Sequence, residues 1–395
     1  MCSPFECPGH GKESRMKKTK IFFIIYMCFW LAENSLSPYL GLYYESRGLS
    51  GTQIGVINSV FSVAVILSAL AIGVIGDKLQ NSRTILLLLC AGMILGVASL
   101  AAGAGYIQIL GAIVLYGCAY SPFNGIVDKA LMGQLKGEEE KFGRYRMGGT
   151  IGAGIGVLIA GILLKYYTFK SIFLTYCITM LVCSLFSAKL PVFGIKPAES
   201  ATYRDYIMVI RHKNFLSIYI PMVIWGITES GVMQFQALHV ARCGYSSSYT
   251  SLFIASAMVG ECLMFGVIPK ILKKLGKRKA VVLAYILQFG RAGALALLGV
   301  LPLPVVVLLQ MTGGGAYAAL YSTITQMIGE TFPEKIACTA HNLKLVVTRG
   351  IGTTIGSMFL GILYDKGMTV PAYGTLAVTA ALYAAGMFLK KEELC

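Results

Sequence analysis

Ser121-Pro-Phe-Asn-Gly-Ile-Val-Asp-Lys129, followed after a short charged loop by Phe142-Gly-Arg-Tyr-Arg-Met-Gly-Gly149, is the most informative stretch of the sequence. Apolar sequence flanks both parts, so Asp128 lies near the end of one hydrophobic segment and Arg146 near the start of the next. Ionisable side chains inside a membrane are costly and by default face the protein interior. Two antiparallel helices would bring Asp128 and Arg146 to similar depth, and we interpret the hairpin as half of a substrate or ion site. In the alternative interpretation, Arg144 and Arg146 are only loop charges at the cytoplasmic surface.

The composition is that of a membrane protein. Hydrophobic residues make up 56% of the 395 residues, charged residues only 13%, and the mean hydropathy is +0.70. A soluble domain carries about 25% charged residues. With about 20 apolar residues per crossing, the chain has room for about a dozen membrane spans. The net charge of +16 comes from loops, where Lys and Arg set the topology and contact anionic lipid head groups, so we expect membrane lipid and not nucleic acid as a partner.

The hydrophobic segments predict twelve transmembrane helices in an all-α polytopic protein. They are expected at about 21–44, 53–76, 84–103, 106–132, 146–165, 169–188, 214–239, 249–269, 280–299, 304–328, 337–364 and 370–389. The longest hydrophilic interruption, 190–213, is interpreted as a cytoplasmic linker. The predicted domains are a cytoplasmic tail over 1–20, a six-helix bundle over 21–189, the linker, a second six-helix bundle over 214–390 and a cytoplasmic tail over 391–395.

Basic residues orient the chain, because they are concentrated in cytoplasmic loops. The two tails and one alternate set of loops hold about two dozen of them, whereas the other five loops hold about five. Those five are Arg47, Lys165, Lys170, Arg242 and Lys366. Both termini are therefore expected in the cytoplasm, and the protein is expected to be a multi-pass protein of the plasma membrane.

Cysteines and the N-terminal tail predict no metal site. Most of the eleven cysteines stand singly in apolar segments, where cysteine behaves as a small hydrophobe. Only Cys2, Cys7 and His10 cluster, and their spacing does not match a metal site. Met16, followed by basic residues and an apolar run, resembles a natural start, so residues 1–15 are expected to be a disordered extension or not native. The long first apolar run has no small-residue cleavage site, which argues against a signal peptide.

An internal repeat indicates two related halves. Six residues of the fifth predicted span recur in the eleventh at an offset of 200: Gly152, Ile155, Gly156, Gly161, Ile162 and Leu163 match Gly352, Ile355, Gly356, Gly361, Ile362 and Leu363. The two spans are six apart, as expected for two parallel six-helix halves. The glycines themselves are interpreted as packing residues.

These features resemble the major facilitator superfamily. The segment Gly73-Val-Ile-Gly-Asp77-Lys-Leu-Gln-Asn-Ser-Arg83 is similar to the superfamily's Gly-x-x-x-Asp-Arg-x-Gly-Arg signature, with Asn81 in place of the second glycine. The resemblance implies two pseudo-symmetric six-helix bundles. It also implies a cytoplasmic gate at Gly73, Asp77 and Arg83, which hold helix ends together in one conformation.

Within that superfamily the chain resembles the group of the lactose and phenylpropionate permeases. Phe142-Gly-Arg-Tyr-Arg146-Met is similar to the lactose permease segment whose second arginine holds the sugar, and Asp128 lies where that permease has the partnering glutamate. Three positions depart from it. The His and Glu of the permease's proton relay are replaced by Gln310 and Gly313. The permease's sugar-stacking Trp has no counterpart, since Gly149 and Thr150 lie in that part of the sequence. Lactose is therefore an improbable substrate, and proton coupling would use other carboxylates.

The same resemblance implies two charged pairs in the second half. Glu261 and Arg291 are similar to the coupling Glu and Arg of the permease, and Glu229 and Arg349 lie where it has an interhelical charge pair. Burial favours the neutral form of Glu261 unless a cation is near, so it could carry a proton by alternating with an ion pair to Arg291. The alternative is a static pair. We expect Glu229 and Arg349 to be structural.

Polar side chains within the spans complete the expected substrate cavity. They are Glu33, Asn34, Asn124, Asp128, Arg146, Gln234 and Gln310. For Glu33 and Asn34 the alternative is a buried polar pair bonded to a neighbouring helix. The glutamines suit hydroxyls, amides or nucleobases, since an amide both donates and accepts hydrogen bonds.

The sequence therefore predicts a secondary active transporter of a small polar or organic solute, with proton-coupled uptake preferred. Two bundles of a single monomer would rock around a midplane cavity. The alternative is a drug/proton antiporter, since the fifth span is glycine-rich. The sequence contains no phosphate-binding loop and no His-Glu-x-x-His motif, so we expect no enzyme, no ATP-driven transport and no cofactor. A sensor or receptor is disfavoured by the lack of a partner-binding domain.

Overall fold

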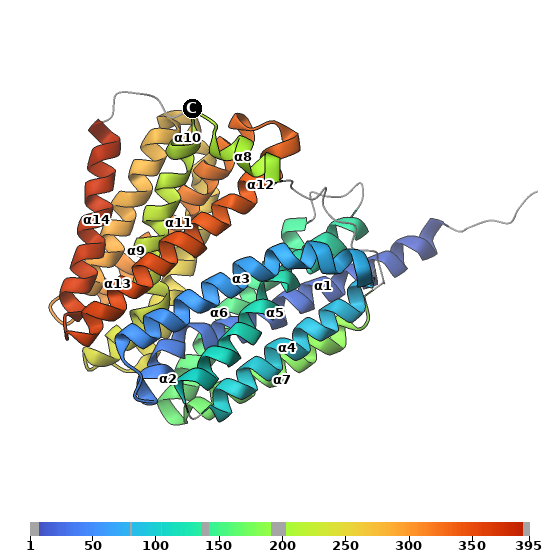
Figure 1. Cartoon of the computed structure of the whole chain (residues 1–395), viewed down its shortest axis with the longest axis horizontal. Coiled ribbons are helices and arrows are strands. Elements are labelled where there is room, and N and C mark those ends of the chain that lie inside the picture. Colours follow the sequence, from blue (N-terminus) through green and yellow to red (C-terminus); the bar gives the residue numbers. More distant parts are fainter. Residues whose placement is uncertain (1–7, 80, 104, 136–141, 191–202, 390–395) are drawn as a thin grey trace, which may run out of the picture. The chain divides into compact units, whose positions relative to one another are not determined.

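The chain is helical along the described residues, as the hydrophobic segments predict (Figure 1). The computed structural model describes residues 8–79, 81–103, 105–135, 142–190 and 203–389. Across these ranges the only strand-like pairing is an isolated bridge between Leu298 and Leu301. The prediction of an all-α fold is confirmed.

The helices follow the chain in a simple order. They are α1 (Pro8–Leu36), η1 (Ser37–Tyr39), α2 (Leu40–Ser46), α3 (Gly51–Leu79), α4 (Ser82–Ala102), α5 (Tyr106–Gln134), α6 (Phe142–Tyr166), α7 (Phe169–Ser187), α8 (Tyr203–Ile210), α9 (Phe215–Arg242), α10 (Ser247–Ala296), α11 (Leu303–Thr331), α12 (Glu334–Leu345), the π-helical turn η3 (Val346–Gly352), α13 (Thr353–Asp365) and α14 (Thr369–Leu389).

Eleven helical segments of the described chain are long and apolar enough to cross a membrane. One of them, α10, has 50 residues. At about 1.5 Å per residue it would reach about 75 Å, more than twice the roughly 30 Å of a bilayer core. Gly276 interrupts it with φ 77° and ψ 166°, a conformation that glycine adopts without a Cβ clash. Divided at Gly276, α10 supplies the two spans predicted at 249–269 and 280–299, so the structure agrees with twelve crossings.

Contacts divide the chain into two compact units. Unit 1 comprises Met1–Leu36, Leu67–Ala160 and Thr168–Pro197, and unit 2 comprises Ser37–Ile66, Gly161–Tyr167 and Ala198–Cys395. Two short segments of the predicted first bundle thus group with the second half of the sequence. The linker and bundle boundaries stay predictions, since 191–202 lies outside the described residues.

In unit 1 the glycines of α6 permit an unusually close approach to α1. A Cβ at Gly152 would lie 2.1 Å from the carbonyl oxygen of Met27. Gly148 and Gly156, one turn to either side, are similarly close to the α1 backbone. Elsewhere in the unit α1 packs on α7, and α4 packs on both α5 and α7. The predicted packing role of these glycines is confirmed.

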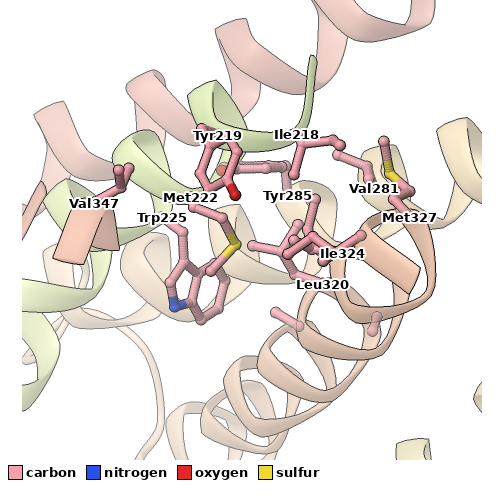
Figure 2. Close-up of a cluster of buried hydrophobic side chains, with 14 of the residues drawn as sticks. Ile218, Tyr219, Met222, Trp225, Val281, Tyr285, Leu320, Ile324, Met327 and Val347 are labelled. Atoms are coloured by element: carbon pink, nitrogen blue, oxygen red, sulfur yellow. The ribbon is translucent and has the colours of Figure 1, made fainter. Parts of the chain in front are cut away.

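In unit 2 apolar side chains of α9, α10 and α11 form a common core. Figure 2 shows its centre, with Trp225 and Tyr219 from α9, Tyr285 from α10 and Ile324 from α11 packed together. The hydroxyl of Tyr285 donates a hydrogen bond to the carbonyl oxygen of Pro221, which satisfies its only donor inside the core. This core fixes the relative positions of α9 and α10, which carry Glu229 and Arg291.

The repeated glycines of unit 2 make the same kind of contact as those of unit 1. A Cβ at Gly352 would lie 2.5 Å from the carbonyl oxygen of Val223 on α9, and one at Gly356 would lie 2.5 Å from that of Ile227. Two of the repeated glycines of the sequence, Gly152 and Gly156, therefore have the same packing role as Gly352 and Gly356.

Candidate functional site

A polar cluster in unit 1 joins α1, α5 and α6. The hydroxyl of Tyr26 on α1 donates a hydrogen bond to Asp128 on α5. The guanidinium of Arg146 on α6 lies 5.1 Å from the ring centroid of Tyr26 and 5.2 Å from that of Trp30. A cation in such a position is attracted to the ring face by about 0.5–2 kcal/mol. Tyr26 thus contacts both residues of the predicted pair, while no direct bond between Asp128 and Arg146 occurs in the described chain.

Trp30 reaches this cluster because position 149 has no side chain. A Cβ at Gly149 would lie 2.7 Å from Cδ1 of Trp30 and 2.8 Å from Nη1 of Arg146. The sugar-stacking tryptophan that the lactose permease group has near this position is absent from the sequence around Gly149. In the structure an indole from α1 occupies that neighbourhood instead.

Two buried polar atoms near this cluster have no hydrogen-bond partner among the described residues. They are the indole nitrogen Nε1 of Trp30 and the amide oxygen Oδ1 of Asn124, which lies one turn before Asp128 on α5. Buried polar groups are nearly always bonded, so unbonded ones need an explanation, such as an absent ligand or water. Together they offer a donor and an acceptor beside a carboxylate and a guanidinium.

Glu33 lies further along α1, with its side chain between α5 and α7. Its carboxylate accepts hydrogen bonds from the hydroxyls of Tyr116, at 2.6 Å, and Tyr176, at 2.8 Å, and it is only 4% exposed. Asn34 instead donates to the backbone oxygen of Trp30, at 3.0 Å, within α1. For Glu33 the structure therefore supports the alternative of a polar group bonded to neighbouring helices.

A second cluster, in unit 2, is built around Arg291 on α10. Its Nη1 lies 3.1 Å and 3.2 Å from the two carboxylate oxygens of Glu229 on α9. Gln288 donates to the same carboxylate at 3.2 Å, and Nε of Arg291 donates to Gln310 on α11 at 3.4 Å. A Cβ at Gly313 would lie 1.9 Å from Cδ of Arg291, so the glycine that replaces the permease's relay residue makes room for this arginine.

This geometry corrects the predicted charged pairs. Glu229 pairs with Arg291 and not with Arg349, and Glu261, the predicted partner of Arg291, makes no hydrogen bond or ion pair within the described chain. Arg349 lies in η3, whose wider π-turn places side chains on a different face from a regular α-helix. The register transferred from the permease therefore does not hold in this part of the chain.

The predicted substrate-binding glutamines both contact neighbouring helices. Gln234 on α9 accepts a hydrogen bond from the hydroxyl of Ser357 on α13, and Gln310 is fully buried against Arg291. By contrast Gln236, which is 2% exposed, has neither amide atom bonded within the described residues. Gln236, a third glutamine whose amide suits hydroxyls, amides or nucleobases, is thus also a candidate ligand-binding side chain.

The predicted cytoplasmic gate is described only in part. Arg83 donates to the carbonyl oxygen of Leu190 from Nε at 3.1 Å and from Nη2 at 2.7 Å, within unit 1. The side chains of Gly73 and Asp77 lie outside the described residues. The gate therefore stays a prediction.

Sequence reasoning missed a set of polar contacts inside unit 2. Arg242, in the last turn of α9, pairs with Glu45 at 2.7 Å and donates to the carbonyl oxygen of Tyr364 at 3.1 Å. Asp365 accepts hydrogen bonds from the backbone amides of Gly51 and Thr52 at the start of α3. Charged residues are scarce in the predicted loops that hold these contacts, so each one could have been singled out as a candidate for a structural hydrogen bond or ion pair.

The described residues thus form helices that cross a membrane, with buried charges gathered on helix faces and no arrangement of His, Cys, Asp and Glu that could hold a metal ion. The chain belongs to the MFS_1 like family, whose model matches residues 20–374. By its family it is a membrane transporter and not an enzyme. The predicted membership of the major facilitator superfamily is confirmed, whereas the lactose permease group stays an expectation.

Several proteins are similar over most of the chain. "Putative nucleoside transporter YegT" of Escherichia coli (strain K12) is 23% identical over 380 residues, covering 89% of this chain and 85% of that protein. Maltose permease of Geobacillus stearothermophilus is 22% identical over 349 residues, covering 88% of each. Among solved structures, nucleoside transporter NupG has a TM-score of 0.80 at 17% identity, covering 95% of this chain and all of that one. The D-xylose-proton symporter has a TM-score of 0.70 at 13% identity, covering 95% and 98%. The chain is accordingly a secondary transporter of a small solute.

Proposed function

We propose that this protein is a proton-coupled symporter that imports nucleosides across the plasma membrane. It acts as a monomer in contact with membrane lipid, with both termini on the cytoplasmic side. The observation that carries the proposal is the cluster in unit 1, where Trp30, Arg146 and Asp128 present an aromatic surface, a cation and a carboxylate together.

The chemistry of this cluster suits a nucleoside. The carboxylate of Asp128 can accept hydrogen bonds from ribose hydroxyls, and Arg146 can donate to the carbonyl or ring nitrogen of a base. Stacking of a base on an aromatic side chain contributes about 1–3 kcal/mol. The unbonded Trp30 nitrogen and Asn124 oxygen supply one further donor and one further acceptor. The similarity to YegT, named as a putative nucleoside transporter, and to the nucleoside transporter NupG supports the same substrate class.

For proton coupling we propose Glu261 on α10 as a carrier. It lies in the same unit as the Glu229–Arg291 pair, yet no hydrogen bond or ion pair holds it among the described residues. A carboxylate without a fixed partner can bind and release a proton without first breaking an ion pair. The similar fold of a protein named as a D-xylose-proton symporter supports this form of energy coupling.

The test is uptake of external labelled uridine or adenosine into liposomes that contain the purified protein. We expect an inward proton gradient to drive accumulation, and Asp128→Asn and Arg146→Ala to weaken apparent affinity by about 10- to 100-fold, since each loses a charged hydrogen bond. Glu261→Gln should abolish accumulation but keep exchange. Gly154→Ala is the matched control, because a Cβ there meets nothing within 4 Å. Normal transport by Asp128→Asn would remove the assigned site.

The second candidate substrate is a sugar, favoured by the similarity to maltose permease. Labelled maltose and xylose, tested with the same liposomes, distinguish the two candidate substrates, because a sugar transporter would not take up nucleosides. Vesicles of opposite orientation distinguish uptake from drug export: accumulation only in inside-out vesicles would favour the antiporter.

A further inference from the structure

We propose that Glu33 is a second proton-binding residue of this transporter, and that its protonation state acts on the Asp128–Arg146 cluster through helix α1. The role rests on the proposed proton-coupled transport. The sequence suggested Glu33 as a substrate ligand, but the structure directs its carboxylate away from that role and into contact with two tyrosines.

The setting of Glu33 is unusual for a buried carboxylate. Its two oxygens accept one phenol hydrogen bond each, from Tyr116 on α5 and Tyr176 on α7. These two phenols are the titratable groups that contact Glu33 in the described chain, and Tyr120 packs behind them with its ring 6.1 Å from that of Tyr116. No cation there pairs with it. Burying a charge without a counter-ion costs several kcal/mol, so the ionised form of Glu33 depends on access of water to the site.

Two partly buried carboxylates, Glu229 and Asp128, are arranged differently. Glu229 has Arg291 as its counter-ion at 3.1 Å. Asp128 is bonded to Tyr26, and the guanidinium of Arg146 lies over the ring of that tyrosine. Glu33 alone among these three relies entirely on neutral donors. Such donors stabilise the carboxylate but compete poorly with a proton once the site is closed to water.

Helix α1 connects Glu33 to the substrate cluster. Tyr26, Trp30 and Glu33 follow each other at intervals of four and three residues, so they lie along one face of α1. Gly152 and the glycines one turn away hold α1 directly against α6, which carries Arg146. A small shift or rotation of α1 would therefore displace Glu33, Tyr26 and Trp30 together.

The proton step changes the hydrogen bonds of this face. In the ionised state both phenols donate to the carboxylate, for which the two oxygen–oxygen distances of 2.6 Å and 2.8 Å are suited. A proton taken from water on one side converts Glu33 to the acid, whose own O–H then donates to one phenol oxygen. That phenol can no longer donate to the same oxygen of Glu33, so one hydrogen bond between α1 and a neighbouring helix reverses its direction. Release of the proton to water on the other side restores both bonds.

The proposal predicts that Glu33→Gln separates accumulation from exchange. In liposomes the variant should lose proton-driven accumulation of uridine by at least 10-fold, while exchange without a gradient stays within about twofold of wild type. Proton uptake on adding uridine to purified protein in weakly buffered solution should fall by about one proton per molecule. Accumulation and proton uptake equal to wild type would overturn the proposal.

Tyr176→Phe provides a test that does not remove the carboxyl. The variant loses one donor to the ionised form, so protonation should occur at higher pH, and the half-maximal pH of transport should rise by up to about one unit. An unchanged pH profile counts against the proposal even if Glu33→Gln misfolds. If wild-type protein carries uridine with no response to a proton gradient, the proposed function itself fails. If wild type responds and both variants behave like it, only the role of Glu33 fails.

Discussion

In unit 1, α6 packs on α1 through Gly148, Gly152 and Gly156, and in unit 2, η3 and α13 pack on α9 through Gly352 and Gly356. The backbone contacts are alike, but the charges beside them are not. Arg146 lies over two aromatic rings, whereas Arg291 is held by a carboxylate and a glutamine.

This difference indicates a division of labour between the repeats. In unit 2 the ion pair between Glu229 and Arg291 satisfies both charges within the protein. In unit 1 the guanidinium of Arg146 makes no hydrogen bond within the described residues, and the nitrogen of Trp30 is also unbonded. Donors that the protein leaves unbonded are available to a ligand, so the repeated packing has been kept while the side chains that could bind solute differ.

The largest expected effect concerns the ion pair of unit 2. Arg291→Leu should lower the free energy of unfolding by about 3–5 kcal/mol, because Glu229 would keep a buried charge without a partner. The double variant Glu229→Leu with Arg291→Leu should recover most of that loss, since no unpaired charge remains. Thermal unfolding of purified protein measures both. Equal stability of Arg291→Leu and wild type would show that this pair is not needed, and the contrast with Arg146 would disappear.

A smaller effect is expected at the helix crossings. Gly152→Ala and Gly352→Ala should each cost roughly 1–3 kcal/mol, because the new Cβ would approach a facing carbonyl oxygen at 2.1 Å or 2.5 Å and the helices must separate. The matched control is again Gly154→Ala, on the open side of α6. Among the three variants, Gly154→Ala should have the highest melting temperature in thermal unfolding. If only one crossing proved sensitive, the equivalence of the two repeats would be limited to sequence.

Much of the fold follows from the sequence, because bilayer crossing imposes long apolar segments and loop charges mark their ends. The offset of 200 between Gly152 and Gly352 likewise identified residues with the same packing role. The interruption of α10 at Gly276 lies between two predicted spans, where a glycine in a basic segment already indicated a loop.

The partners of the buried charges were harder to predict. A residue can be assigned to a span with an error of a few positions, yet a shift of one position turns a side chain by about 100° around a helix. The π-turn at Arg349 adds such a shift, and Glu229 was assigned to the wrong arginine. Tyr26 and Trp30 gave no signal, because aromatic residues are common in apolar segments and only the fold shows which of them contact Asp128 and Arg146.

The smallest expected effect tests what kind of interaction holds Arg146. Arg146→Lys keeps the charge but loses the planar group that lies over Tyr26 and Trp30, so we expect uridine affinity to fall by about 2- to 30-fold, corresponding to about 0.5–2 kcal/mol. Since the guanidinium makes no ion pair in the described chain, thermal stability should change little. Arg291→Lys is the matched variant, and we expect the opposite result there. A lysine cannot bond Glu229 and Gln310 together as the guanidinium does, so thermal stability should fall while uridine affinity at the unit 1 cluster is retained. Isothermal titration and thermal unfolding of the two variants side by side measure both quantities. A loss of stability in Arg146→Lys as large as that in Arg291→Lys would mean that both arginines are structural, and the unit 1 cluster would no longer be distinguished as the place where solute binds.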